Sequence, residues 1–160
     1  MEKYFTMLNQ TSLMKKSLFI KACLLLFPSI YAIHSNAQNP VNWTDKQLMQ
    51  PSELAGIIKN NPKDVTIISV GPFNTIPGAI NVGMVSEQEN MDKFKAQLSA
   101  LNKDAKIVVY CGCCPYEHCP NVRPAIDALK QMKFTGFYLL NLPDNLKIDW
   151  INKGYPVTQQ

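Results

Sequence analysis

Four short apolar runs, separated by amphipathic segments, predict the strands of a sheet. They span residues 65–70, 79–82, 106–110 and 137–142, and turn-forming residues lie around them. The first run, VTIISV, is nearly continuous in apolar character and rich in β-branched residues. That composition is typical of a strand buried on both faces, as strands are in a parallel sheet.

Amphipathic segments before, between and after these runs predict helices. We expect helices after Thr44 and after Ser52, which are typical N-cap residues, and then over the ranges 86–101, 123–132 and 144–154. Asn121 is a further N-cap candidate, ahead of the fourth helix. The alternation of strands and helices predicts one α/β domain with a largely parallel sheet.

Residues 1–37 have the layout of a secretory signal peptide. From Met14 onward, two lysines precede an apolar run and then small residues at Ser35 and Ala37. The apolar run has about a dozen residues, whereas a membrane span needs about 20. We therefore expect export, with a periplasmic location, cleavage after Ala37 and no stable membrane span afterwards. Met14 is the expected initiator if the start codon lies later than Met1, and an uncleaved amphipathic anchor is the alternative.

Loss of the signal segment changes the charge balance. The chain has a formal net charge of +4, of which the segment carries +3 through four lysines and one glutamate, so residues 38–160 carry +1. This balance predicts no basic face for nucleic acid. The remaining length suits a single domain with its own core.

The main chemical feature is a cysteine-rich loop between a predicted strand and a predicted helix. Four of the five cysteines lie within nine consecutive residues, namely Cys111, Cys113, Cys114 and Cys119. In an exported protein such cysteines can persist as disulfides or as a maintained set of thiols. A cysteine at a strand end, close to a helix start, is a good nucleophile because amide donors and the helix dipole stabilise its thiolate.

Three segments in order make the chain resemble the rhodanese family of sulfurtransferases. VTIISV is followed by IPGAINV, KIVVYC places Cys111 where that family keeps its nucleophile, and DWINKGYPV is similar to its closing segment. The resemblance implies a rhodanese-like α/β fold with a mainly parallel central sheet and helices on both faces. Ser69 and Gly71 stand where the family usually has Asp and Arg, and the loop from Cys111 to Arg123 is longer than the family's.

The resemblance also implies a reaction. Cys111 would accept sulfane sulfur as a persulfide and Arg123 would hold an anionic donor. One of Cys113, Cys114 and Cys119 would then release or relay the sulfur. The expected partner is a small sulfur-containing donor or acceptor, or a protein thiol.

Two other interpretations of the same loop stay open. The thiols with His118 would suit a soft metal ion such as copper or zinc, although the spacing matches no strong zinc pattern. A disulfide from Cys113 or Cys114 to Cys119 would instead pin the loop of a non-catalytic interaction domain. No cofactor is predicted, since GPFNTIPG lacks the lysine and the spacing of a phosphate-binding loop.

Overall fold

The computed structural model describes residues 43–158 of the 160-residue chain. The predicted signal segment, residues 1–37, and its cleavage position lie outside the described residues. In the part of the chain that is described, no helix is both long and apolar enough to cross a bilayer.

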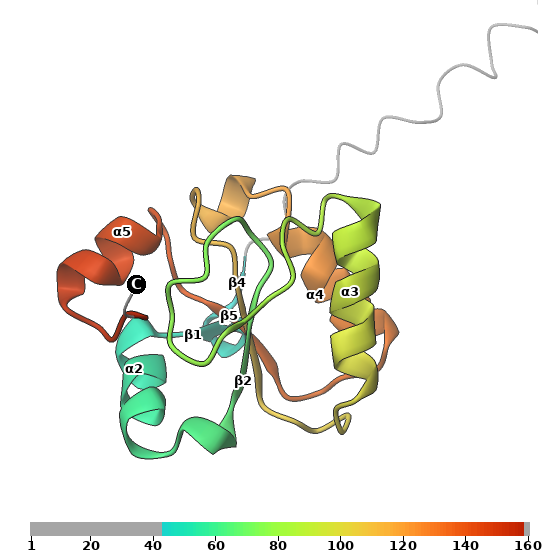
Figure 1. The fold of residues 1–160 in the computed structure, drawn as a ribbon, viewed down its shortest axis with the longest axis horizontal. Coiled ribbons are helices and arrows are strands. Elements are labelled where there is room, and N and C mark those ends of the chain that lie inside the picture. Colours follow the sequence, from blue (N-terminus) through green and yellow to red (C-terminus); the bar gives the residue numbers. More distant parts are fainter. Residues whose placement is uncertain (1–42, 159–160) are drawn as a thin grey trace, which may run out of the picture. The chain divides into compact units, whose positions relative to one another are not determined.

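A five-stranded sheet, parallel throughout, forms the centre of the domain (Figure 1). Its strands follow the order β1-β5-β4-β2-β3. They comprise β1 (Leu48–Met49), β2 (Thr66–Ser69), β3 (Ile80–Asn81), β4 (Ile107–Tyr110) and β5 (Phe137–Leu140). The predicted strands are therefore confirmed in type and in the parallel direction of their pairing.

Helices cover both faces of this sheet (Figure 1). One face packs against α3 (Gln88–Ser99) and α4 (Val122–Gln131), and the other against α2 (Pro51–Asn60) and α5 (Leu146–Asp149). Short 3-10 helices complete the chain: η1 (Asp45–Gln47), η2 (Pro62–Asp64), η3 (Tyr116–His118) and η4 (Ile151–Lys153).

Strand β4 lies in the middle of the sheet and contributes to both halves of the core. Val108 and Tyr110 face the cluster that contains Trp150, while Val109 faces the cluster that contains Leu129. All four residues of β4 are fully buried. This alternation explains why the sequence run is apolar without a polar face, and it holds the end of β4 rigidly where the cysteine loop begins.

The first predicted helix is wrong. The chain after Thr44 forms only the 3-10 turn η1 and then the two-residue strand β1, which pairs with β5 through Leu48 and Met49. Two residues are too short for any periodicity to reveal a strand. The second helix begins earlier than expected: Gln50 is its N-cap and Pro51 its first residue, a position that suits proline because no partner is needed for its missing N–H.

Candidate active site at the cysteine loop

Cys111 leaves the buried end of β4 and lies directly against Gly71, the residue that follows β2 and Val70. A β-carbon on Gly71 would lie 2.5 Å from the Cys111 sulfur and 2.7 Å from its carbonyl oxygen. Real β-carbons do not approach other atoms so closely. Because Gly71 has no side chain, it leaves room for the sulfur and the carbonyl oxygen of Cys111, and any larger residue would clash with them.

Gly112 turns the chain immediately after Cys111. Its φ of 78° lies in the left-handed region, which glycine adopts without steric cost. Its carbonyl oxygen accepts a hydrogen bond from the backbone N–H of Leu146 at 3.0 Å, and α5 leaves no room for a side chain at this position. The turn brings the next residue back, so that the sulfur of Cys113 lies 3.2 Å from that of Cys111.

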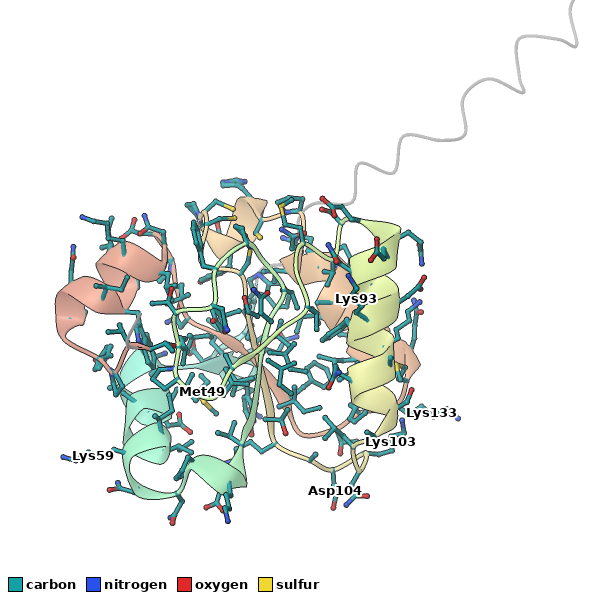
Figure 2. All side chains as sticks on the ribbon, viewed as in Figure 1. Met49, Lys59, Lys93, Lys103, Asp104 and Lys133 are labelled. Atoms are coloured by element: carbon teal, nitrogen blue, oxygen red, sulfur yellow. The ribbon has the colours of Figure 1, made fainter. Side chains whose placement is uncertain are left out.

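The turn and the start of α4 together build a cluster of three thiols, formed by Cys111, Cys113 and Cys119. Their sulfur atoms all lie within 4.8 Å of one another. Cys111 and Cys119 are buried, whereas Cys113 is exposed. Figure 2 shows the sulfur atoms of this loop, in yellow, gathered at one end of the sheet. The sequence predicted the residues of this cluster but not their mutual distances.

Cys111 and Cys119 form a hydrogen-bonded pair whose pKa values are shifted in opposite directions. The Cys111 thiol donates to Cys119, and the backbone N–H groups of Asn121 and Val122 at the start of α4 also donate there, which lowers the pKa of Cys119 to about 5. The same hydrogen bond, together with burial and the nearby Cys113, raises the pKa of Cys111. Of the two thiols, Cys119 therefore gives up its proton more readily, and Cys111 holds its proton more strongly.

The other predicted site residues belong to the same loop or to the first turn of α4. The sulfur of Cys114 is 3.3 Å from that of Cys113, and burial followed by the Cys113 hydrogen bond raises the pKa of Cys114 to about 12. Arg123 lies in the first turn of α4 with its guanidinium 5.5 Å from the centre of the Trp43 ring. His118 ends η3 and is exposed. All four cysteines of the described residues are free thiols.

Ser69 and Tyr110 fix the loop that leaves β2. The hydroxyl groups of both residues donate to the backbone carbonyl of Phe73, and Ser69 is fully buried. Burial raises the pKa of Tyr110, so its hydroxyl stays a donor. Ser69 thus holds the loop beside Gly71 through a neutral hydrogen bond, at a position where the resemblance would have placed a carboxylate.

Asn121 is a site residue whose role the sequence did not reveal. It occupies the N-cap position of α4 as predicted, but its side chain makes no capping hydrogen bond. Its amide nitrogen instead lies 3.5 Å from the Cys111 sulfur, and its amide oxygen accepts the backbone N–H of Ser86 at 2.9 Å. Asn121 is buried and so ties Cys111 to the segment ahead of α3.

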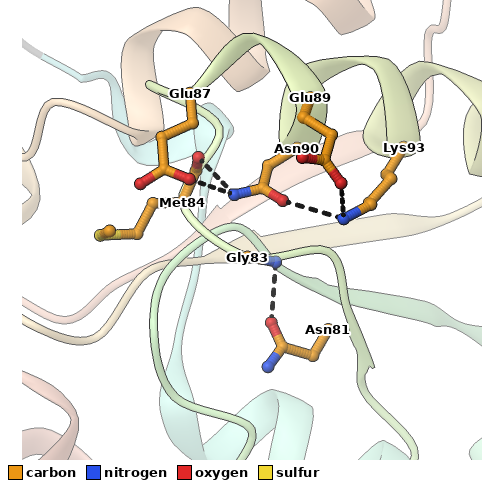
Figure 3. A network of polar contacts seen from close by, with 7 residues as sticks. All are labelled: Asn81, Gly83, Met84, Glu87, Glu89, Asn90 and Lys93. Carbon is orange, nitrogen blue, oxygen red and sulfur yellow. Dashed lines mark hydrogen bonds and ion pairs between the residues drawn. The ribbon is translucent and has the colours of Figure 1, made fainter.

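A polar network holds that segment in place (Figure 3). Asn90 donates to the carbonyl of Met84 at 3.1 Å and to the carboxylate of Glu87 at 2.9 Å. Asn81 accepts from the backbone N–H of Gly83, whose φ of 84° makes the turn. Because Ser86 lies inside this braced segment, its N–H is a fixed partner for Asn121.

Replacing Asn121 with alanine should destabilise the protein by about 1–2 kcal/mol, because it leaves the partly buried N–H of Ser86 without its acceptor. Urea unfolding measures the change. Asn152→Ala, at an exposed position in η4, is the matched control and should stay within about 0.5 kcal/mol of the parent. Equal stability of the two variants would show that the Asn121 bond contributes nothing.

Comparisons with known proteins support the fold. No protein-family model matches the chain, and no curated protein matches it. A solved protein from Lactobacillus plantarum is 16% identical with a TM-score of 0.51, covering 71% of this chain and 89% of its own. The Alr3790 protein from Anabaena is 19% identical with a TM-score of 0.50, covering 69% of this chain and 90% of its own.

A single-domain sulfurtransferase from Saccharomyces cerevisiae is 14% identical with a TM-score of 0.48, covering 70% of this chain and 95% of its own. At identities of 16% and 19%, the structures from Lactobacillus plantarum and Anabaena bear on the fold and not on the chemistry. The chain has the rhodanese-like α/β fold that the sequence resemblance implied.

Proposed function

We propose that this chain is an exported sulfur-transfer protein that carries sulfane sulfur as a persulfide in the cluster of Cys111, Cys113 and Cys119. The observation that carries the proposal is the mutual approach of the three sulfur atoms, all within 4.8 Å at the end of β4. A persulfide passes between thiols by direct attack of one sulfur on another, so the thiols must lie this close.

Loading begins at Cys111. Its sulfur attacks the outer sulfur of the donor, while its proton passes to the Cys119 thiolate to which it is already hydrogen-bonded. The sulfur–sulfur bond of the donor breaks, and its electron pair leaves with the rest of the donor, which is sulfite when the donor is thiosulfate. Arg123, in the first turn of α4, supplies positive charge for an anionic donor.

Delivery runs through Cys113. Its sulfur lies 3.2 Å from that of Cys111 and is exposed, whereas Cys111 is buried. Attack of the Cys113 thiolate on the outer sulfur of the Cys111 persulfide forms a persulfide on Cys113 and returns Cys111 as a thiolate, which recovers its proton from Cys119. No net oxidation occurs. The acceptor, a small thiol or a protein thiol, then takes the sulfur from the exposed position.

Cys113→Ser tests this path. The variant should still load one sulfur atom from thiosulfate, but sulfide release to dithiothreitol should fall by about tenfold or more, because the buried persulfide has lost its exposed relay. Intact mass reports the loading, and a sulfide assay reports the delivery.

Cys114→Ser is the matched control, since the neighbouring thiol is removed while the three clustered sulfurs remain. It should load and deliver like the parent. A Cys113→Ser protein that delivers at the parent rate would remove Cys113 from the path, and a parent that takes up no sulfur would refute the proposed function.

A further inference from the structure

The geometry points to a second use of the same three thiols: Cys111, Cys113 and Cys119 form a three-coordinate site for Cu(I). Each residue offers one sulfur, and the three sulfurs all lie within 4.8 Å of one another. This inference does not depend on sulfur transfer, because it needs only the position and the chemistry of the sulfur atoms.

The spacing of the sulfur atoms fits one central ion. Metal–thiolate bonds are about 2.3 Å long, so three sulfurs around one ion in a plane lie about 4 Å apart. The Cys111 and Cys113 sulfurs, at 3.2 Å, would separate by less than about 1 Å to reach that distance. Cys113 can make this movement because it is the exposed member of the cluster.

The scaffold holds two of the ligands and leaves the third adjustable. Cys111 is fixed between β4 and Gly71, and Cys119 precedes α4 and is buried as well. Cys113 lies on the loop between them, after the turn at Gly112 that α5 holds through Leu146. An ion would therefore meet the exposed thiol first and then reach two pre-positioned sulfurs, which limits the ordering that binding requires.

The donor set favours Cu(I) over Zn²⁺. Soft thiolate ligands select Cu(I), whereas structural zinc takes four ligands in tetrahedral geometry. Among residues 43–158, the group of potential ligands that lie within mutual reach here has three members. His118 and Cys114, which would offer a fourth, do not belong to that group.

An anaerobic competition titration tests the inference. The fully reduced protein is titrated with Cu(I) in the presence of the chromogenic chelator bicinchoninate, and it should withdraw one equivalent of copper. X-ray absorption of the loaded protein should show three sulfur neighbours and no nitrogen neighbour. Cys113→Ser should weaken the retention of copper by at least about tenfold.

Cys114→Ser is again the matched control, because it removes the adjacent thiol and keeps all three proposed ligands; it should hold copper within about threefold of the parent. Circular dichroism verifies that both variants are folded. The inference is overturned if the protein withdraws no copper from bicinchoninate, or if it binds one Zn²⁺ and no Cu(I). It is also overturned if Cys114→Ser lowers the affinity for copper as much as Cys113→Ser does. If the protein binds copper but takes up no sulfur from thiosulfate, the proposed sulfur transfer is refuted and the Cu(I) site is supported.

Discussion

Replacing Cys111 with serine should abolish the sulfur adduct that forms when the reduced protein is incubated with thiosulfate. The hydroxyl group is a far weaker nucleophile than a thiol and cannot form a persulfide. Cys113 and Cys119 remain, but on the proposed path both act after or beside Cys111. Sulfide release to dithiothreitol should fall by more than about 1,000-fold, the scale seen when a nucleophile is removed.

The fold should survive this change. Serine has nearly the shape of cysteine, and its hydroxyl group keeps a donor and an acceptor at the position where Cys111 contacts Cys113, Cys119 and the Asn121 amide. Circular dichroism and urea unfolding should therefore give curves close to those of the parent. A folded variant without an adduct separates the chemical role of Cys111 from a structural one.

The adduct must also be located. Peptide mapping of the loaded parent should place the extra sulfur on Cys111 or, after relay, on Cys113, and Cys114→Ser should load normally. Retention of the adduct in Cys111→Ser, mapped to Cys119, would contradict the proposed order. Cys119 would then be the nucleophile, in keeping with its lowered pKa and the amide donors at the start of α4.

Much of the fold follows from short patterns. The central strands β2 and β4 are largely buried on both faces, so they lie in nearly continuous apolar runs rich in β-branched residues, and the sequence marks them clearly. Strand β1 cannot be predicted in this way, because it has only two residues and is defined by its pairing with β5. Its existence depends on a neighbour that comes much later in the chain, since Leu48 pairs with Leu139.

The site shows the same division between local and long-range information. The strand pattern and the family resemblance single out Cys111, and composition singles out the loop. The 3.2 Å approach of Cys113 depends on Gly112, whose tight turn is held by Leu146 of α5. The role of Asn121 depends on Ser86, 35 residues earlier. Contacts of this kind leave no periodic signal, so the sequence predicted the site residues without their geometry.

Gly71→Ala should destabilise the protein by about 3 kcal/mol and move Cys111. The new β-carbon would have to displace the Cys111 sulfur, 2.5 Å away, or its carbonyl oxygen, 2.7 Å away. Overpacking of a close-packed interior costs about 1–3 kcal/mol. The upper end is expected here, because one of the clashing atoms is the backbone carbonyl oxygen of Cys111, which moves less easily than a side chain. Because the buried sheet on either side cannot move easily, the strain should fall on the start of the cysteine loop.

Gly56→Ala is the matched control. Gly56 lies within α2, where a β-carbon would have no neighbouring atom within 4 Å, and alanine is favoured over glycine inside a helix by up to about 1 kcal/mol. Urea unfolding should therefore show the two alanine variants shifted in opposite directions from the parent.

Gly71→Ala should reduce sulfur loading by more than the loss of folded protein alone would explain. Displacement of Cys111 breaks its contacts with Cys113 and Asn121 together, so sulfur loading should fall even at temperatures where the variant is fully folded. Normal loading in a destabilised variant would show that the loop tolerates a shift of its first cysteine. Unchanged stability would mean that the Cys111 sulfur can move away from Gly71 without cost, and the close contact would then not define the site.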